Sequence, residues 1–190
     1  MDEPQAVLDF WLNEVGSDGW YLAVDTVDAD IARRFGKLWE RAMAGGLADW
    51  GRTAQGALAY LIVTDQFPRN MFRGDGRSFA TDAAARTLAR SAIEQGLDLQ
   101  TNEPERVFFY MPFEHSEDAA DQDFSVGLMQ SRLPETGADF AIHATVHREI
   151  IRRFGRFPFR NAALGRTSTA AELAFIEAGG YGAWVRDMAQ

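Results

Sequence analysis

Apolar residues recur at intervals of three and four along most of the chain, which is the spacing of one face of an α-helix. Val7, Leu8, Phe10 and Trp11 show this pattern near the start. Glycines and prolines separate one such stretch from the next. The pattern predicts a first helix over about 4–14 and a second from a cap at Asp25 or Thr26 to Gly45-Gly46. It predicts further helices over 53–67, 81–96, 102–112, 117–132 and 138–154, and a last helix that begins at Thr169.

Capping residues predict where several of these helices begin, because their side-chain oxygens accept hydrogen bonds from the first backbone N–H groups. Five predicted helices are preceded by such a residue: Thr53, Thr81, Asn102, Ser116 and Thr169. Glu105 and Glu172 follow three residues after Asn102 and Thr169, which is the spacing of a capping box. Proline has no N–H to donate, so we expect Pro68 and Pro112 to end the third and fifth helices.

The fold class that follows is all-α. No stretch alternates apolar and polar residues for long enough to predict a strand. Helices of this length are unstable alone in water, so we expect about eight of them to pack as antiparallel hairpins. Their number favours a tetratricopeptide-like superhelical stack over a four-helix bundle, although the 34-residue tetratricopeptide signature is not in register. The length of 190 residues predicts a single all-helical domain over residues 1–190.

Composition excludes several classes of protein. The chain has no cysteine, which excludes a disulfide framework, a thiolate nucleophile and a cysteine zinc site. Its net charge of −9 argues against general binding to nucleic acid or to anionic membranes. The longest apolar run, residues 57–63, is far shorter than the roughly 20 residues that span a bilayer. The opening Met1-Asp2-Glu3-Pro4 lacks the layout of a signal peptide, so we expect a cytoplasmic protein.

The charge is distributed unevenly. Residues 103–123 hold seven acids and one base, a net charge of −6, whereas residues 148–166 hold six arginines and one acid, a net charge of +5. All of the basic residues except Lys37 are arginine, whose guanidinium binds carboxylate or phosphate with two parallel hydrogen bonds. The second segment is therefore a candidate for anion binding. The bias toward arginine has a second explanation in the nucleotide composition of the genome.

A short motif occurs twice. Phe67-Pro68-Arg69-Asn70 and Phe157-Pro158-Phe159-Arg160-Asn161 both place Phe-Pro ahead of Arg-Asn at the end of a predicted helix. Proline releases the chain from helical geometry, and the Arg and Asn that follow can bind the unpaired carbonyls of the helix end. The same side chains can instead point into a shared cavity. Both interpretations stay open at this point.

Four runs of the chain have a distinctive order and spacing: residues 64–70 with 72–74, 79–82, 110–117, and 153–158 with Arg160-Asn161 and Gly165-Arg166. From Val7-Leu8-Asp9-Phe10-Trp11 to Thr169, the chain resembles the bacterial domain-of-unknown-function 924 family. The resemblance implies an all-helical, tetratricopeptide-like fold and no established activity. The family often has histidine where this chain has Phe159, and His143 corresponds to no position of the family pattern.

Glu114-His115-Ser116-Glu117-Asp118 follows Pro112 at a junction between two predicted helices, where side chains can converge. A carboxylate beside an imidazole is a minimal general acid/base pair. The alternative is that Ser116 caps the next helix and that the two acids after it stabilise its first turn. The sequence therefore offers Glu114 and His115 as candidate catalytic residues.

His143 and His147 are four residues apart, on one face of a predicted helix, which is also the spacing of two metal ligands. A zinc-protease helix requires glutamate at position 144, where this chain has alanine. We therefore expect no metal. We expect His147 to donate a hydrogen bond to a carboxylate such as Glu114 and to join the candidate catalytic residues.

Two hypotheses of function follow. In the first, Arg69, Asn70, Arg73, Arg156, Arg160 and Asn161 bind a small anionic molecule in a pocket where Glu114, His115 and His147 supply polar or proton-transfer chemistry. No cofactor is expected, and whether the pocket is catalytic stays open. In the second, the concave face of stacked hairpins binds a peptide. The sequence predicts neither the identity of the ligand nor the oligomeric state.

Overall fold

The computed structural model describes residues 3–190, so Met1 and Asp2 of the acidic opening lie outside the described residues. Within this range every regular element is a helix and no strand is present, which confirms the all-α fold class. The chain forms two compact units, which comprise residues 1–112 and 113–190. The predictions of a single domain and of a tetratricopeptide-like superhelical stack remain predictions.

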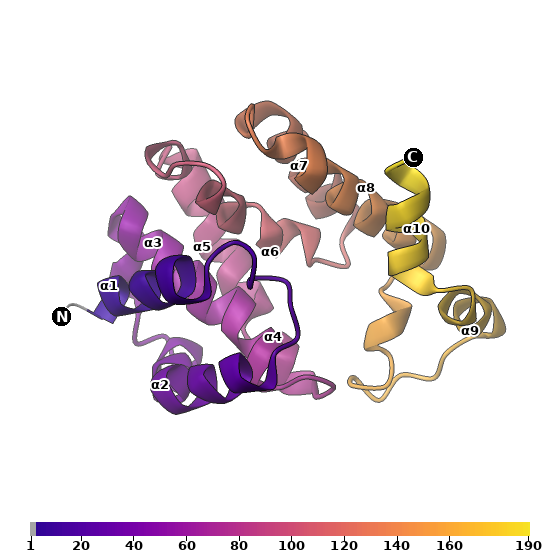
Figure 1. Cartoon of the computed structure of the whole chain (residues 1–190), viewed down its shortest axis with the longest axis horizontal. Coiled ribbons are helices and arrows are strands. Elements are labelled where there is room, and N and C mark those ends of the chain that lie inside the picture. The colour runs from indigo at the N-terminus through magenta and orange to yellow at the C-terminus, as the bar shows by residue number, and fades with distance from the viewer. Residues whose placement is uncertain (1–2) are drawn as a thin grey trace. The chain divides into compact units, whose positions relative to one another are not determined.

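The first unit contains six α-helices and shorter helical turns between them. Its α-helices are α1 (Glu3–Leu8), α2 (Asp25–Met43), α3 (Ala54–Leu61), α4 (Phe67–Met71), α5 (Asp82–Glu94) and the start of α6 (Met111–Glu114). The π-helical segments are η1 (Asp9–Val15) and η3 (Ile62–Gln66), and the 3-10 helices are η2 (Ala48–Arg52), η4 (Gly76–Phe79), η5 (Asp98–Gln100) and η6 (Glu105–Phe109). Helix α1 packs against α3, α2 against α4, and α3 against α5 (Figure 1).

Aromatic rings form the centre of the first unit. Phe67 lies with its ring centroid 5.6 Å from that of Trp11 and 5.0 Å from that of Phe35. Trp11 is fully buried and its ring also lies 6.4 Å from that of Phe108. These contacts join residues from η1, α2, α4 and η6, so the apolar stripes that predicted the helices also form their shared core.

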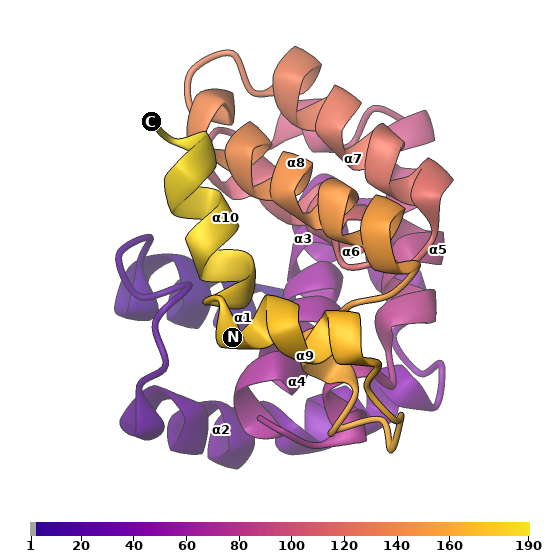
Figure 2. The ribbon, with the colours of Figure 1, turned by 90° about the vertical axis from the view of Figure 1, so that its right-hand side faces the viewer.

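The second unit contains α7 (Ala119–Arg132), α8 (Gly137–Phe154), the 3-10 helix η7 (Pro158–Arg160), α9 (Ala170–Glu177) and α10 (Gly180–Met188). Helices α7 and α8 pack side by side (Figure 2), and the short connection between them makes the pair an antiparallel hairpin. Helix α10 packs against α8 and α9. The core residues that α8, α9 and the residue before η7 contribute are Val146, Ile150, Ile151, Phe157 and Phe175.

Several predicted helix limits are confirmed. Gly16 and Gly155, both with positive φ, end the first helical segment and α8, where a residue with a side chain would be strained. Thr53 caps α3 by accepting a hydrogen bond from the Gly56 N–H at 3.1 Å. Thr169 and Glu172 form both halves of the predicted capping box at the start of α9.

The prediction that Pro68 ends a helix is wrong. The chain changes to a π-helical segment at Ile62–Gln66 and continues into α4, where Pro68 lies in the first turn and its missing N–H is not needed. The carbonyl of Thr64, four residues before the proline, instead accepts a hydrogen bond of 2.5 Å from the Thr81 hydroxyl. Arg69 donates to the carbonyl of Asp65 at 2.6 Å, as one interpretation of the repeated motif expected.

Pro112 does not end a helix either, because it lies inside α6. Three of the predicted caps are also wrong. Helix α2 begins at Asp25 without a side-chain cap, and Asn102 is separated by Pro104 from the 3-10 helix that begins at Glu105. Asp118 rather than Ser116 caps α7, because Asp118 immediately precedes the first helical residue and its carboxylate reaches the N–H groups of Ala120 and Asp121.

Thr81 precedes α5 as predicted, but its side chain makes no cap hydrogen bond there because its hydroxyl bonds Thr64 and Trp39 instead. Helix α10 was not predicted. Across residues 3–190, no helix is long and apolar enough to cross a membrane.

Candidate functional site

The turn between α6 and α7 carries Glu114 and His115, and a glutamine from α7 holds it in place. The amide nitrogen of Gln122 lies 2.6 Å from the carbonyl oxygens of both Glu114 and Ser116, and 3.3 Å from that of Phe113. Gln122 is completely buried, and its amide oxygen has no hydrogen-bond partner within residues 3–190. A buried amide that binds several carbonyls of one turn restricts the positions of the side chains on that turn.

Glu114 contacts His147 of α8, as the sequence predicted. The Glu114 side chain is buried, and its Oε1 atom lies 2.7 Å from Nδ1 of His147. The same Nδ1 atom lies 2.9 Å from the backbone carbonyl oxygen of His143. The backbone carbonyl oxygen of His143 and the ionised carboxylate of Glu114 can only accept hydrogen bonds. Nδ1 of His147 therefore carries the proton. The Nε2 atom of His147 is then the atom that can take up or release a proton.

The three histidines of the chain gather around this pair. The ring of His115 lies with its centroid 6.3 Å from that of His147, and His143 precedes His147 by one turn of α8. Tyr181 of α10 forms a hydrogen bond through its hydroxyl with Nδ1 of His143, and its ring centroid lies 4.7 Å from that of His147. We call Glu114, His115, His143, His147 and Tyr181 the histidine cluster.

Opposing effects act on the carboxyl group of Glu114. Burial acts to raise its pKa, but the charge and hydrogen bond of His147, with the charges of His115 and His143, hold the pKa below the usual 4.5. Glu114 is therefore an ionised hydrogen-bond acceptor near neutral pH, which orients the imidazole of His147. Nowhere in the described part of the chain do three or more His, Cys, Asp or Glu side chains form a group that could hold a metal ion.

An aromatic ring and an arginine continue the histidine cluster toward η7. The ring centroid of Phe157 lies 5.3 Å from that of His147, with the two rings nearly perpendicular. The guanidinium carbon of Arg160 lies 4.4 Å from the centre of the same Phe157 ring, in the range of a cation–π contact. Arg160 is only 7% exposed. A buried cation and His147 thus flank one phenyl ring.

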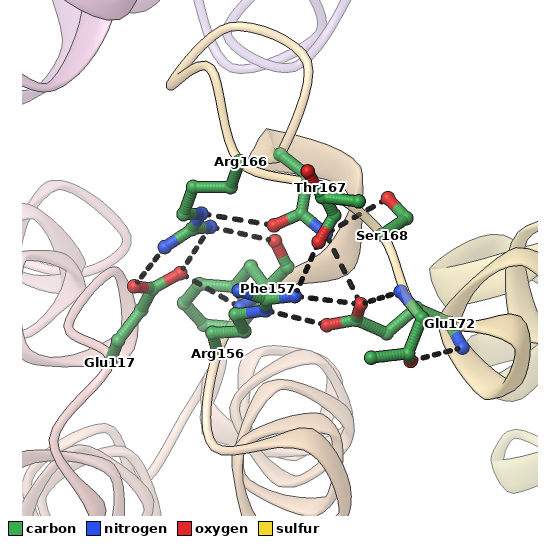
Figure 3. A network of polar contacts seen from close by, with 9 residues as sticks. Glu117, Arg156, Phe157, Arg166, Thr167, Ser168 and Glu172 are labelled. Atoms are coloured by element: carbon green, nitrogen blue, oxygen red, sulfur yellow. Dashed lines mark hydrogen bonds and ion pairs between the residues drawn. The ribbon is translucent and has the colours of Figure 1, made fainter.

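A network of ion pairs braces the loop between α8 and α9 (Figure 3). Glu117 accepts two hydrogen bonds from Arg166, at 2.8 and 3.0 Å, and one from the Phe157 N–H at 2.8 Å. Glu172 accepts two from Arg156, at 2.6 and 2.8 Å. Asn161 accepts from Arg166 and donates to the hydroxyl of Ser168. The network fixes the backbone that carries Phe157 and Arg160.

Two of the six predicted anion-binding residues thus have a defined place in this network. Arg156 directs its guanidinium to a carboxylate of the protein, and Asn161 binds the neighbouring loop. These contacts stabilise the fold, so a ligand that bound Arg156 would share or displace Glu172. The ligand-binding role of both residues remains a prediction.

Arg69, Asn70 and Arg73 belong to the first unit, whereas Arg160 lies in the second unit beside Phe157. Arg69 donates two hydrogen bonds to Asp82, at 2.9 and 3.0 Å. Arg73 donates two to Asp28, and Asn70 donates to the same carboxylate at 2.8 Å. Asp28 lies in the first turn of α2, so Asn70 of α4 and Arg73, two residues after the end of α4, both bind to α2. Their ligand-binding role also remains a prediction.

The structure thus brings the candidate catalytic residues Glu114, His115 and His147 together. Sequence reasoning missed Gln122, because a lone buried glutamine in a helix carries no recognisable pattern. It also missed Tyr181, because helix α10 was not predicted, although the apolar pair Trp184-Val185 after Gly179-Gly180 was a signal for that helix. His143 was set aside because it matched no family position, yet its side chain binds Tyr181.

Comparison with known proteins gives a match to a family and a match to a solved structure, both of unknown function. A family described as "bacterial protein of unknown function (DUF924)" matches residues 7–180. A solved structure of a protein of unknown function from Agrobacterium tumefaciens is 39% identical to the chain, with a TM-score of 0.86. The alignment covers 93% of this chain and 97% of that one. Comparison with curated proteins gives no match.

Proposed function

Because this chain belongs to the bacterial protein family of unknown function DUF924, we propose its function from its own residues. It binds a small anionic molecule at the histidine cluster, and His147 exchanges a proton with that molecule through Nε2. Glu114 orients His147, and His115 and Arg160 supply positive charge for the anion.

One observation carries this proposal: the 2.7 Å contact between the buried carboxylate of Glu114 and Nδ1 of His147. A buried ion pair is costly in free energy, and an apolar pair of similar size would often be as stable. A carboxylate on Nδ1 fixes the imidazole tautomer and orients the ring, so that Nε2 is the atom that can accept a proton. The arrangement therefore has a chemical use that packing alone does not require.

The charges around the cluster favour an anion as the ligand. Arg160 is a cation one phenyl ring away from His147, and its charge also acts on Glu117. When Nε2 of His147 carries a proton, it can donate to a bound carboxylate or phosphate, and hydrogen bonds to a charged partner are stronger than those between neutral groups.

The test is isothermal titration calorimetry with inorganic phosphate and citrate near neutral pH. We expect the wild type to bind at least one of them, and the variant His147→Asn to bind it about tenfold to hundredfold more weakly, as for the loss of one hydrogen bond to a charged group. Asparagine keeps an N–H near Glu114 but has no atom at the position of Nε2. His147→Gln, which places an amide nitrogen near that position, should retain part of the affinity.

Arg152→Ala is the matched control, because Arg152 also lies on α8 but is exposed and pairs with Asp123 and Glu149. Its affinity for the anion should equal that of the wild type. The proposal is wrong if the wild type binds neither anion. It is also wrong if His147→Asn binds the anion as tightly as the wild type and the control Arg152→Ala do.

A further inference from the structure

Helix α10 places a tyrosine against two histidines of α8. The hydroxyl of Tyr181 is hydrogen-bonded to Nδ1 of His143, and the Tyr181 ring centroid lies 4.7 Å from that of His147. His143 and His147 are one helical turn apart, so the phenol ring contacts both members of the pair. All three side chains are partly buried, neither enclosed in the core nor fully exposed.

The hydroxyl of Tyr181 is not needed to attach α10 to the rest of the second unit. Trp184 and Val185 already pack from α10 against the core residues of α8 and α9, and the Trp184 ring lies 5.0 Å from that of Phe175. A phenylalanine at position 181 would keep the ring contacts with both histidines. The hydroxyl adds a hydrogen bond with a second imidazole, that of His143.

We propose that Tyr181 is a second proton-transfer residue of the site and that its hydroxyl contacts the anionic ligand. This inference rests on the proposed function of His147. The site then contains two pairs of similar design: Glu114 holds the imidazole of His147, and the imidazole of His143 holds the phenol of Tyr181. The group that reacts is an imidazole in the first pair and a phenol in the second.

The proton balance of the second pair follows from the tautomer of His143. When Nδ1 of His143 carries a proton, it donates to the oxygen of Tyr181, and the phenol O–H is directed to an oxygen of the ligand. If the ligand takes that proton, the O–H bond of Tyr181 breaks and its electron pair stays on the phenolate oxygen. The His143 N–H continues to donate to that oxygen, and a proton from water or from Nε2 of His147 restores the phenol.

The class of ligand follows from the two reacting groups. A ligand that contacts both needs an oxygen that accepts a hydrogen bond from the phenol and a second polar atom that contacts Nε2 of His147. Carboxylates and phosphates that carry a hydroxyl or a second acidic oxygen have this layout. Citrate and inorganic phosphate separate the two classes as probes.

The test compares the wild type with Tyr181→Phe by calorimetry with each anion, in two buffers whose enthalpies of ionisation differ. The two buffers report how many protons are taken up or released when the anion binds. We expect Tyr181→Phe to bind about tenfold more weakly or worse, with a changed number of protons exchanged. Tyr21→Phe removes an exposed tyrosine hydroxyl of the first unit and should change neither quantity.

The outcomes separate this inference from the proposed function. Wild-type binding with a weakened Tyr181→Phe and a changed proton count supports both. Wild-type binding that Tyr181→Phe leaves unchanged in affinity and proton count overturns the role of Tyr181 alone. The absence of binding to the wild type overturns the proposed function, and the role of Tyr181 with it. A far-ultraviolet circular dichroism spectrum of Tyr181→Phe that matches the wild type shows that a weakened affinity is not a loss of folding.

Discussion

At the scale of the residue, the second unit keeps a charged carboxylate where an apolar side chain would be expected. Glu114 is 4% exposed and follows Phe113, which is fully buried. Burial of an ionised carboxylate costs several kcal/mol unless partners compensate for it. Here the Nδ1–H of His147 and the charges of two further histidines compensate, and they hold the pKa of Glu114 low although burial acts to raise it. The stability of the turn therefore depends on the histidines.

Replacement of Glu114 tests this dependence. Glu114→Leu leaves the buried N–H of His147 without its carboxylate, so we expect the free energy of unfolding to fall by about 1–3 kcal/mol. Glu114→Gln retains an oxygen that can accept from Nδ1 and should lower it by less. Urea unfolding curves of the three proteins measure the differences. A Glu114→Leu variant as stable as the wild type would show that the pair carries no stabilising interaction.

At the scale of the element, the break between α3 and α4 is held by a residue from another helix. Thr81, just before α5, donates to the Thr64 carbonyl and accepts from Nε1 of Trp39 at 3.2 Å. Thr64 lies in the π-helical segment η3 and is completely buried, so its carbonyl has no access to water. The Thr81 hydroxyl thus pairs two buried groups. One is the Thr64 carbonyl, to which Pro68 has no N–H to donate, and the other is the indole N–H of Trp39 in α2.

Thr81→Val should therefore destabilise the protein by about 1–3 kcal/mol, because it leaves a buried carbonyl and a buried indole N–H unpaired at similar side-chain volume. Thr81→Ser keeps the hydroxyl and serves as the matched control. Thermal unfolding followed by circular dichroism compares the two. Equal losses in the Val and Ser variants would show that the hydrogen bonds of the hydroxyl are not what the Val variant loses.

The capping box of α9 predicts a dependence of stability on pH. Hydrogen bonds from Arg156 and from the Thr169 N–H lower the pKa of Glu172 from 4.5 to about 2. Because the folded pKa is the lower one, the stabilisation is fully present above pH 4.5 and is lost as the pH falls toward 2. We expect Glu172→Gln to be less stable than the wild type near neutral pH.

The difference between Glu172→Gln and the wild type should shrink as the pH falls from 4.5 to about 2. Urea unfolding across this interval measures it. A difference that stays constant over the whole interval would contradict the assigned direction of the pKa shift. Glu177→Gln, at the other end of α9 and exposed, is the control.

The same elements show what the sequence could predict. Periodic apolar residues and local caps such as Thr53 and the Thr169–Glu172 box depend on neighbours within four residues, so they could be found by inspection. The role of Pro68 could not, because the Thr64 carbonyl that it leaves without an N–H is bound by Thr81, seventeen residues after Thr64 in the chain. The contact of His147 with Glu114 was predicted from chemistry, whereas Gln122 and Tyr181 are recognised only by their tertiary neighbours.

At the scale of the whole molecule, the two oppositely charged segments of the sequence pair with each other inside the second unit. Arg166 binds Glu117 at 2.8 Å, and Arg152 and Arg148 bind Asp123 at 2.9 and 3.5 Å. Arg156 binds Glu172, so four of the six arginines of residues 148–166 pair with a carboxylate of the protein. The basic segment is therefore largely neutralised and is not a free positive surface.

This neutralisation, with a net charge of −9, predicts that the protein does not bind nucleic acid. We expect it to pass through a heparin column without retention at low salt and to leave the electrophoretic mobility of duplex DNA and of RNA unchanged. Retention that falls with added salt would contradict this expectation. In that case the variant Asp123→Asn, which removes one of the two carboxylates that Arg148 and Arg152 contact, should bind more tightly still.

The central claim is that Glu114 holds the proton of His147 on Nδ1 and leaves Nε2 for an anionic ligand. Long-range ¹H–¹⁵N correlation spectra of the full chain with ¹⁵N-labelled histidine measure both nitrogens directly. We predict that His147 is protonated on Nδ1 near neutral pH and that phosphate or citrate shifts its Nε2 resonance. A neutral His147 with its proton on Nε2, unchanged by either anion, would contradict the claim.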